Sequence, residues 1–243
     1  MHSWITLRTG LRNSSTGVPI VMITGTLVEM SSGRLVKNNR LSASALVSSG
    51  WAPFSMNGPG PVDVENGNFT VHNPTALGAE TPLPVLVAAL GPVMLQLAGE
   101  HADGTVLWMA DEKAIGDHIA PKITKAAADA GRPAPRIVAG IPVCLCANSE
   151  IDAAKERANR ILSEAETSPN YQKLLDRGDA RSVGDLCAAG DEDSILARFK
   201  QFADAGVTDL SVRLLPIGDT RDELIASKYR TREVIGELAK AVR

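Results

Sequence analysis

The sequence predicts an α/β fold built on a parallel sheet. Four apolar runs of strand length stand at residues 84–89, 104–109, 136–146 and 207–215. Each run is followed by a segment whose apolar residues recur at helical spacing. Strands that alternate with helices in this way form parallel sheets, because each helix carries the chain back to the start of the next strand.

Composition sets limits on function. The chain has 243 residues, of which 44% are hydrophobic and 22% charged, with a formal net charge of −3. This balance gives no basic surface for nucleic acid, and no apolar run is long enough to cross a bilayer. Three cysteines cannot close a disulfide framework, so we expect a protein of the reducing cytoplasm.

The chain divides near residue 61 into a poorly patterned N-terminal segment (1–61) and a well-patterned remainder (62–243). In the first part, Val18–Val28 could be a strand or hairpin and Arg40–Ser48 a short helix. A run rich in proline and glycine at 57–61 ends this segment.

The elements of the second part follow in order. Asn66-Gly67 lies between Val62–Val64 and Phe69–Val71 and indicates a hairpin. The strand 84–89, the helix 92–101 and the strand 104–109 form the first β-α-β unit. Between the first strand and its helix, Gly91-Pro92 makes a sharp corner. Backbone N–H groups that follow Pro92 point over the strand end, where the helix dipole favours an anion such as phosphate.

Helices after this unit are marked by their first residues. Asp111 is expected to cap a helix that continues to about Gly131, with Ile115, Ile119 and Ile123 on its buried face. The strand 136–146 contains Pro142, which predicts a bulge because proline lacks a ladder donor. Four further helices are expected. The first runs from a cap at Asn148 or Ser149 to about Glu166, and a short one follows at Ser168–Arg177. The third runs from Asp191 to Ala205 with Gly206 after it, and the last from Asp219 or Thr220 to the end.

Residues 62–243 resemble the C-terminal half of the luciferase-like monooxygenase superfamily, most closely its coenzyme F-420-dependent oxidoreductases. Three motifs carry the resemblance, namely Pro84-Val-Leu-Val-Ala-Ala-Leu-Gly-Pro92, Leu97-Ala-Gly-Glu-His-Ala-Asp-Gly104 and Gly190-Asp-Glu with Ala203-Asp-Ala-Gly-Val-Thr-Asp-Leu210. The resemblance implies a (β/α) TIM-barrel-type fold of which the last four β/α units are recognisable. It also implies hydride transfer by the deazaflavin F-420, or by FMN as second choice, bound at the C-terminal ends of the strands.

By position, the resemblance implies where the cofactor would lie. The strand end and corner would hold its phosphate through Ala88, Ala89, Leu90, Gly91 and Pro92. Trp108 would lie beside its ring system. Each of these residues also has a purely structural explanation. Ala88 and Ala89 could be small because helix and strand pack closely, and Gly91-Pro92 could be only a tight turn. Trp108 could simply fill space in the core.

Residues 1–60 are too few for four more β/α units, since one unit needs about 30 residues. The sequence therefore predicts an incomplete barrel whose sheet edges need a cover from residues 1–60 or from a second copy. Three functions stay open: an oxidoreductase or monooxygenase that acts on a small molecule, with weak activity in this short form; a non-catalytic half-barrel that binds a phosphorylated ligand or a partner chain; and a non-functional product.

Other chemistry-bearing residues have structural explanations. Cys144 and Cys146 are expected to be small buried residues rather than metal ligands, and no catalytic acid or base is identified. His101 should lie at a helix C-terminus and His118 on a partly exposed helix face. The carboxylates at Asp111-Glu112 and Asp191-Glu192-Asp193 should cap helices, and Arg213 should either bind an acidic group at the strand mouth or form an ion pair.

Overall fold

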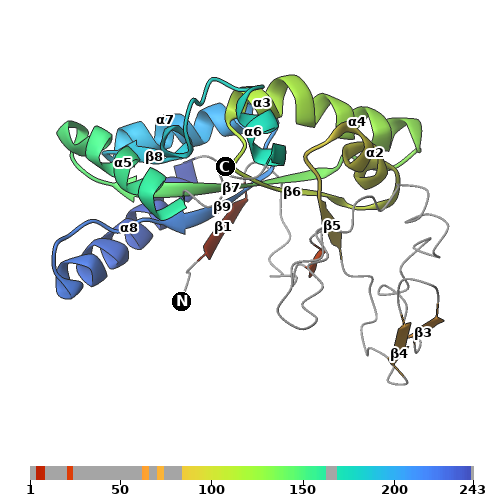
Figure 1. Cartoon of the computed structure of the whole chain (residues 1–243), viewed down its shortest axis with the longest axis horizontal. Helices are drawn as coiled ribbons and strands as arrows, with labels where there is room; N and C mark the ends of the chain where they lie inside the picture. Colours follow the sequence, from red (N-terminus) through yellow and green to blue (C-terminus); the bar gives the residue numbers. More distant parts are fainter. Residues whose placement is uncertain are drawn as a thin grey trace.

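The computed structural model describes residues 4–8, 21–23, 62–65, 70–73, 84–162 and 169–241 (Figure 1). A seven-stranded sheet is its main feature, with the order β1-β9-β7-β6-β5-β2 and with β8 paired to β7. Within the described residues the sheet is open. It is the partial form of the (β/α) barrel that the sequence predicts.

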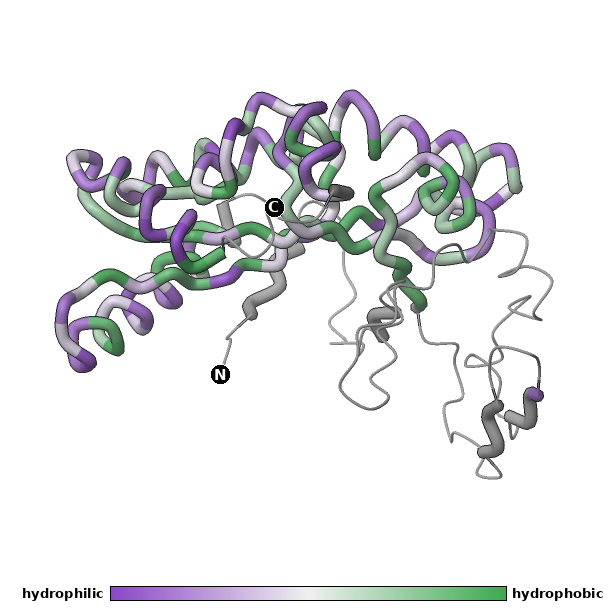
Figure 2. Tube along the Cα trace, viewed as in Figure 1, coloured by the Kyte–Doolittle hydropathy of each residue, from purple (hydrophilic) through white to green (hydrophobic). Residues whose placement is uncertain are grey.

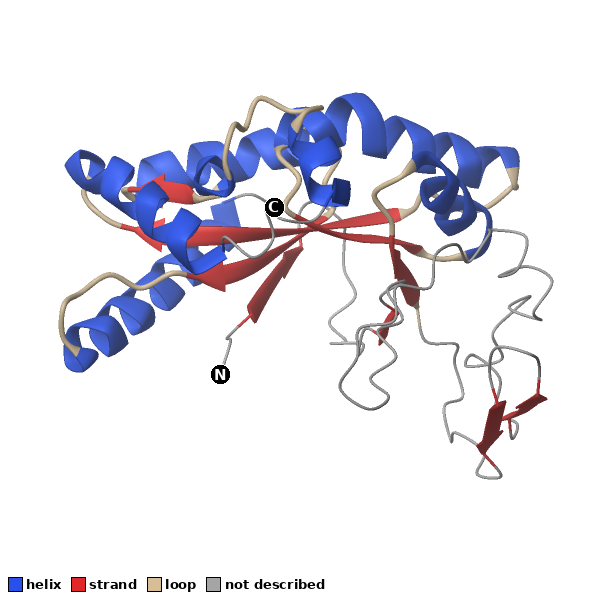
Figure 3. Ribbon diagram, viewed as in Figure 1, coloured by secondary structure: helices blue, strands red, loops and turns tan. Residues whose placement is uncertain are grey.

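Four strands make the parallel centre of the sheet: β5 (Val85–Ala88), β6 (Gly104–Trp108), β7 (Arg136–Leu145) and β9 (Asp209–Leu214). They are adjacent in chain order and correspond to the four predicted apolar runs. Figure 3 shows these strands with helices between them in sequence. The prediction of an α/β fold with a parallel sheet is confirmed.

Two short strands from the N-terminal segment lie on the two outer edges of this centre. β1 (Trp4–Arg8) pairs antiparallel with β9, and β2 (Val21–Ile23) pairs parallel with β5. β2 lies inside the stretch predicted as a strand or hairpin, while the helix predicted at Arg40–Ser48 lies outside the described residues. Residues before position 61 therefore cover both edges that the incomplete barrel would expose.

The hairpin predicted around Asn66-Gly67 is present as a separate two-stranded sheet. β3 (Val62–Glu65) and β4 (Thr70–Asn73) pair antiparallel, with Val64 opposite Val71.

Helices follow the strands at the positions that the sequence indicates. Their bounds are α2 Pro92–His101, α3 Glu112–Ala114, the π-helical turn η2 Ile115–Ile119, α4 Ala120–Asp129, the 3₁₀ turn η3 Asn148–Glu150, α5 Ile151–Leu162, α6 Pro169–Leu175, the 3₁₀ turn η5 Val183–Leu186, α7 Glu192–Asp204 and α8 Arg221–Ala241. Asp111 and Asp191 accept hydrogen bonds from the third helical residue and cap their helices as expected. Thr220 caps α8 reciprocally with Glu223.

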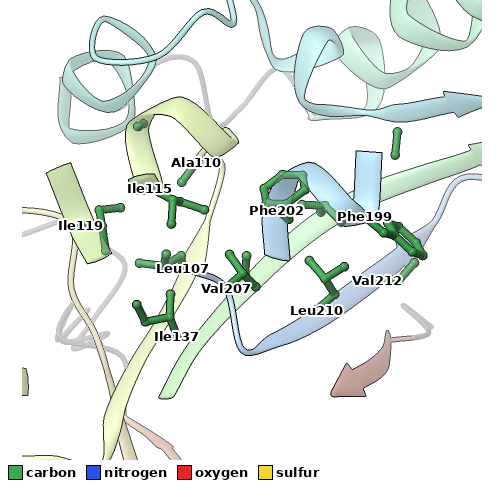
Figure 4. Close-up of a cluster of buried hydrophobic side chains, with 14 of the residues drawn as sticks. Leu107, Ala110, Ile115, Ile119, Ile137, Phe199, Phe202, Val207, Leu210 and Val212 are labelled. Atoms are coloured by element: carbon green, nitrogen blue, oxygen red, sulfur yellow. The ribbon is translucent and has the colours of Figure 1, made fainter. Parts of the chain in front are cut away.

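One hydrophobic core joins the sheet to the helices α2, α4 and α7, which run along one side of it (Figure 1). The hydropathy trace in Figure 2 shows the apolar segments concentrated in the central strands. Phe199 and Phe202 of α7 are fully buried and face Leu210 and Val212 of β9 (Figure 4). The inward helix positions meet the apolar strand residues, and Ile235 of α8 joins the same core.

Two details differ from the sequence predictions, and a third lies partly outside the described residues. Pro142 causes no bulge, since the ladder between β7 and β9 is continuous from Val138 to Val143. The strand β8 (Ala188–Gly190) beside the end of β7 was not predicted. The helix expected to reach Glu166 is described only to Leu162, and residues 163–168 lie outside the described part. None of the described helices is long and apolar enough to span a membrane.

Candidate functional site

The glycine–proline corner lies at the carboxyl end of β5. Gly91 is the N-cap residue of α2, with φ −90° and ψ 158°, and Pro92 occupies the first helical turn. The N–H of Leu95 donates to the carbonyl of Gly91 at 3.0 Å, but no side chain caps the helix. The first amides of α2 are therefore left to water or to a ligand, as at anion-binding helix ends.

This corner is open to solvent. Gly91, Pro92 and Val93 are all exposed, and a Cβ atom placed on Gly91 would meet no heavy atom within 4 Å. The φ of Gly91 is one that any residue adopts, so its backbone does not require glycine. What glycine provides here is free space over the helix N-terminus.

The other three residues of the corner differ in what they expose. Ala89 is 1% exposed and its methyl group belongs to the core. Leu90 is half-buried against the same core. Ala88 is half-buried on the opposite face of β5 from Val87. Ala89 can therefore contribute only main-chain atoms to a ligand.

Trp108 ends β6, directly beside the corner. It pairs with Gly140 of β7, and a Cβ on Gly140 would lie 2.7 Å from the Cε3 atom of the Trp108 ring. The missing side chain of Gly140 thus makes room for the indole. Sequence reasoning missed Gly140, because a glycine inside an apolar strand gives no hint of which neighbour needs its space.

Register places several of these residues on one face of the sheet. Ala88 pairs with Val106, two residues before Trp108, and Gly140 pairs with both Trp108 and Ser211. These side chains lie on the face opposite the core of α2, α4 and α7. Arg213, two residues after Ser211, shares this face and is half-buried.

The chain turns sharply after Trp108. Met109 has φ 62° and is 2% exposed, which makes it the non-glycine residue with positive φ in the described part of the chain. A buried side chain in this conformation carries backbone strain, and such strain gathers at functional sites. Its side chain packs with Leu175 and Leu186, which anchors the turn.

Asp111 holds two segments together behind this turn. Its carboxylate accepts from the N–H of Ala114 at 2.7 Å, of Asp179 at 2.6 Å and of Ala180 at 2.9 Å. The side chain is 5% exposed. The predicted capping role is correct, but the tie to the segment after α6 could not be predicted, since it joins residues 68 positions apart.

His118 does not lie on a partly exposed face, as its helical spacing suggested; it is 6% exposed. Its Nε2 atom is 3.3 Å from the carbonyl oxygen of Leu90, and its Nδ1 atom is 2.9 Å from Nη1 of Arg177. The π-helical turn η2 that contains it changes the helical register, so counting from Ile115 gives the wrong face. His118 therefore contacts the corner predicted to bind phosphate from its buried side, through the carbonyl of Leu90.

The remaining candidates have structural roles. Cys144, Cys146 and Cys187 are free, buried thiols that share one small core cluster, and burial raises the pKa of Cys144 to about 12. His101 is the exposed last residue of α2, as predicted. No group of metal-binding side chains occurs among the residues that the structure describes.

A charged hollow of about 610 Å³ lies on the helix side of the sheet and does not include the corner. Two pairs of its lining residues are ion pairs, Lys155 with Asp185 at 3.4 Å and Arg198 with Glu112 at 2.5 Å. We therefore place the candidate site at the open strand ends, at the corner and Trp108.

Comparisons with known proteins show what the whole chain is similar to. The chain is 25% identical over 196 residues to a 5,10-methylenetetrahydromethanopterin reductase of Methanopyrus kandleri, covering 68% of this chain and 55% of that protein. Its fold is similar to an F420-dependent secondary alcohol dehydrogenase solved with an F420-acetone adduct, with a TM-score of 0.55, 16% identity, and 77% of this chain and 58% of that one covered. An EDTA monooxygenase (EmoA) from Chelativorans sp. BNC1 has a TM-score of 0.51 at 16% identity, over 74% of this chain and 50% of the other.

The chain thus spans 50–58% of the length of these relatives. The family model described as luciferase-like monooxygenase matches residues 51–209, well over half of the chain. This match covers the corner, Trp108, His118 and Asp111, and it confirms the resemblance inferred from the sequence. The chain belongs to the luciferase-like monooxygenase family.

Proposed function

We propose that this chain is an oxidoreductase that binds the deazaflavin F420, with FMN as second choice, and acts on a small molecule. The observation that carries the proposal is the open corner at Gly91, where uncapped helix amides end at the carboxyl edge of a parallel sheet. The relationship to a reductase, and the likeness in fold to an F420-dependent dehydrogenase and a monooxygenase, support it.

The residues fit a cofactor that has an anionic end and a flat ring. The main-chain amides after Gly91 would hold the phosphate, and Ala88 and Gly91 leave room for it. Trp108, resting against Gly140, presents an aromatic side chain on the neighbouring strand for ring contact. The cofactor supplies the hydride chemistry, while the chain binds and orients it and shapes its electrostatic surroundings.

Cofactor titration tests this proposal. Purified chain is titrated with F420 and, separately, with FMN, and cofactor fluorescence is followed. Saturable binding together with substrate-dependent oxidation of the reduced cofactor supports the oxidoreductase. Binding without any turnover supports the second candidate, a non-catalytic half-barrel that binds a phosphorylated ligand. The corner residues favour this candidate in one respect, because they offer backbone amides but no acid or base. No binding of either cofactor contradicts the proposed oxidoreductase.

Gly91→Leu should weaken cofactor binding at least about tenfold, a loss of roughly 1.4 kcal/mol, because the new side chain enters the space over the helix amides. The melting temperature should not fall, since the backbone conformation of Gly91 suits any residue and a Cβ there meets nothing. Fluorescence titration and thermal unfolding measure the two quantities on the same samples.

Gly236→Leu is the matched control. Gly236 is exposed in α8 and also has space for a Cβ, so this change should stabilise the helix by about 0.5–1 kcal/mol and leave cofactor affinity unchanged. If the two variants bind cofactor equally well, the phosphate does not lie at the corner.

A further inference from the structure

His118 connects the corner to a segment far away in the sequence. The side chain comes from the π-helical turn η2 and is 6% exposed. One ring nitrogen, Nε2, lies 3.3 Å from the carbonyl oxygen of Leu90. The other, Nδ1, lies 2.9 Å from Nη1 of Arg177, in the segment after α6.

These two contacts determine where the imidazole proton is. The guanidinium of Arg177 can only donate hydrogen bonds, so Nδ1 of His118 must be the unprotonated acceptor. In a neutral ring the proton then sits on Nε2, which donates to the carbonyl of Leu90. Arg177 therefore selects the His118 tautomer that can donate a hydrogen bond to the carbonyl of Leu90.

The peptide bond between Leu90 and Gly91 transmits this contact to the ligand side. A trans peptide is planar, and its C=O and N–H point in opposite directions. When His118 holds the carbonyl of Leu90 toward the protein interior, the N–H of Gly91 must point away from His118. Gly91 is exposed and has open space around it, so this N–H faces the side that a ligand can reach.

We propose that His118, kept as the neutral Nε2–H tautomer by Arg177, is a positioning residue that aims the N–H of Gly91 at the anionic group of the cofactor. This rests on the proposed function in one respect, the identity of the ligand. The orientation of the peptide is a property of the chain alone.

Charge makes the arrangement sensitive to acid. Protonation would put a proton on Nδ1, remove its acceptor and set two positive groups against each other. Burial first, and then the charges of Arg177 and of Lys122 on α4, lower the pKa of His118, while its bond to Leu90 opposes them. The folded state thus favours neutral His118 more than the unfolded state does. The stability this contributes is present above the ordinary histidine pKa and is lost as pH falls through the lowered one.

The tautomer can be tested without any cofactor. Long-range ¹H–¹⁵N spectra of the histidine rings, recorded from pH 8 to pH 5, should show His118 as the Nε2–H tautomer. It should protonate at a pH below the ordinary pKa of histidine. The backbone amide of Gly91 should shift in the same pH range. A proton on Nδ1 in the neutral form, or a Gly91 amide that does not respond, would overturn the proposal.

Two substitutions test the consequence for binding. His118→Phe keeps a ring but has no donor, and it should weaken F420 or FMN binding about tenfold at pH 7, through the loss of one buried hydrogen bond. His118→Gln keeps an amide donor near the Nε2 position and should restore most of the affinity. His101→Phe, on the exposed end of α2, is the control and should bind like the unchanged chain.

The outcomes separate the two proposals. If the unchanged chain binds neither cofactor, the proposed function fails, while the ring and amide spectra still decide the role of His118. If the unchanged chain binds and both His118 variants bind equally tightly, the positioning role is wrong.

Should His118→Phe fail to fold, the comparison of His118→Gln with the unchanged chain across pH replaces it. The Gln variant should then lose the acid-dependent fall in affinity, and keeping it would overturn the proposal.

Discussion

Asp111→Ala should destabilise the folded chain by about 3–5 kcal/mol, measured by urea unfolding. The carboxylate accepts three backbone hydrogen bonds and is almost fully buried. Alanine would leave these amides without an acceptor, two of them in the segment after α6. Because Arg177 lies in the same segment, two residues before Asp179, the contact between Arg177 and His118 should weaken as well.

Asp191→Ala is the matched control, because Asp191 caps α7 in the same way through the N–H of Ser194 at 2.9 Å. It lies at a less buried helix start, and its second partner is the exposed side chain of Asn148 and not loop backbone. Its loss should therefore cost about 1 kcal/mol, the ordinary value of a helix cap. Equal losses for the two variants would contradict the role assigned to Asp111.

Asp209→Ala should also cost about 3–5 kcal/mol, because it leaves a buried guanidinium without its partner. Arg136 at the start of β7 binds Asp209 of β9 through two hydrogen bonds, at 2.8 Å and 3.1 Å. The side chain of Asp209 is 2% exposed and that of Arg136 is 17% exposed. This pair ties the two longest parallel strands at the end of the sheet opposite the candidate site.

A double variant distinguishes the ion pair from plain packing. Arg136→Met with Asp209→Leu removes both charges, and it should be less destabilised than Asp209→Ala alone. Asp129→Ala breaks the exposed pair with Lys125 and should change stability by less than about 0.5 kcal/mol. A double variant as unstable as the sum of its two single changes would show that the unpaired charge is not the cause.

Most of the fold could be predicted from the sequence, because its signals are local. Asp111, Asp191 and Gly206 mark helix ends through contacts within four residues, and the structure has them in those roles. β8 could not be predicted in the same way. Ala188-Ala189-Gly190 has none of the branched or aromatic residues that indicate a strand, and its pairing with β7 depends on tertiary packing.

The candidate site was predictable only in its main chain. Gly91-Pro92 indicates a corner from two adjacent residues, and the corner is where the sequence places it. The side chains behind it were not predictable, since His118 reaches Leu90 across 28 residues and Arg177 across 59. Helical spacing even gave the wrong face for His118, because a π-helical turn is not visible in apolar periodicity.

The antiparallel strand β1 restricts how this chain could join another one. Residues 4–8 already use the backbone groups of β9 from Asp209 to Arg213 that a neighbouring parallel strand would need. A second chain that completed the barrel at this edge would have to displace residues 4–8 from β9. Such an assembly would form by strand exchange and not by docking of two folded chains.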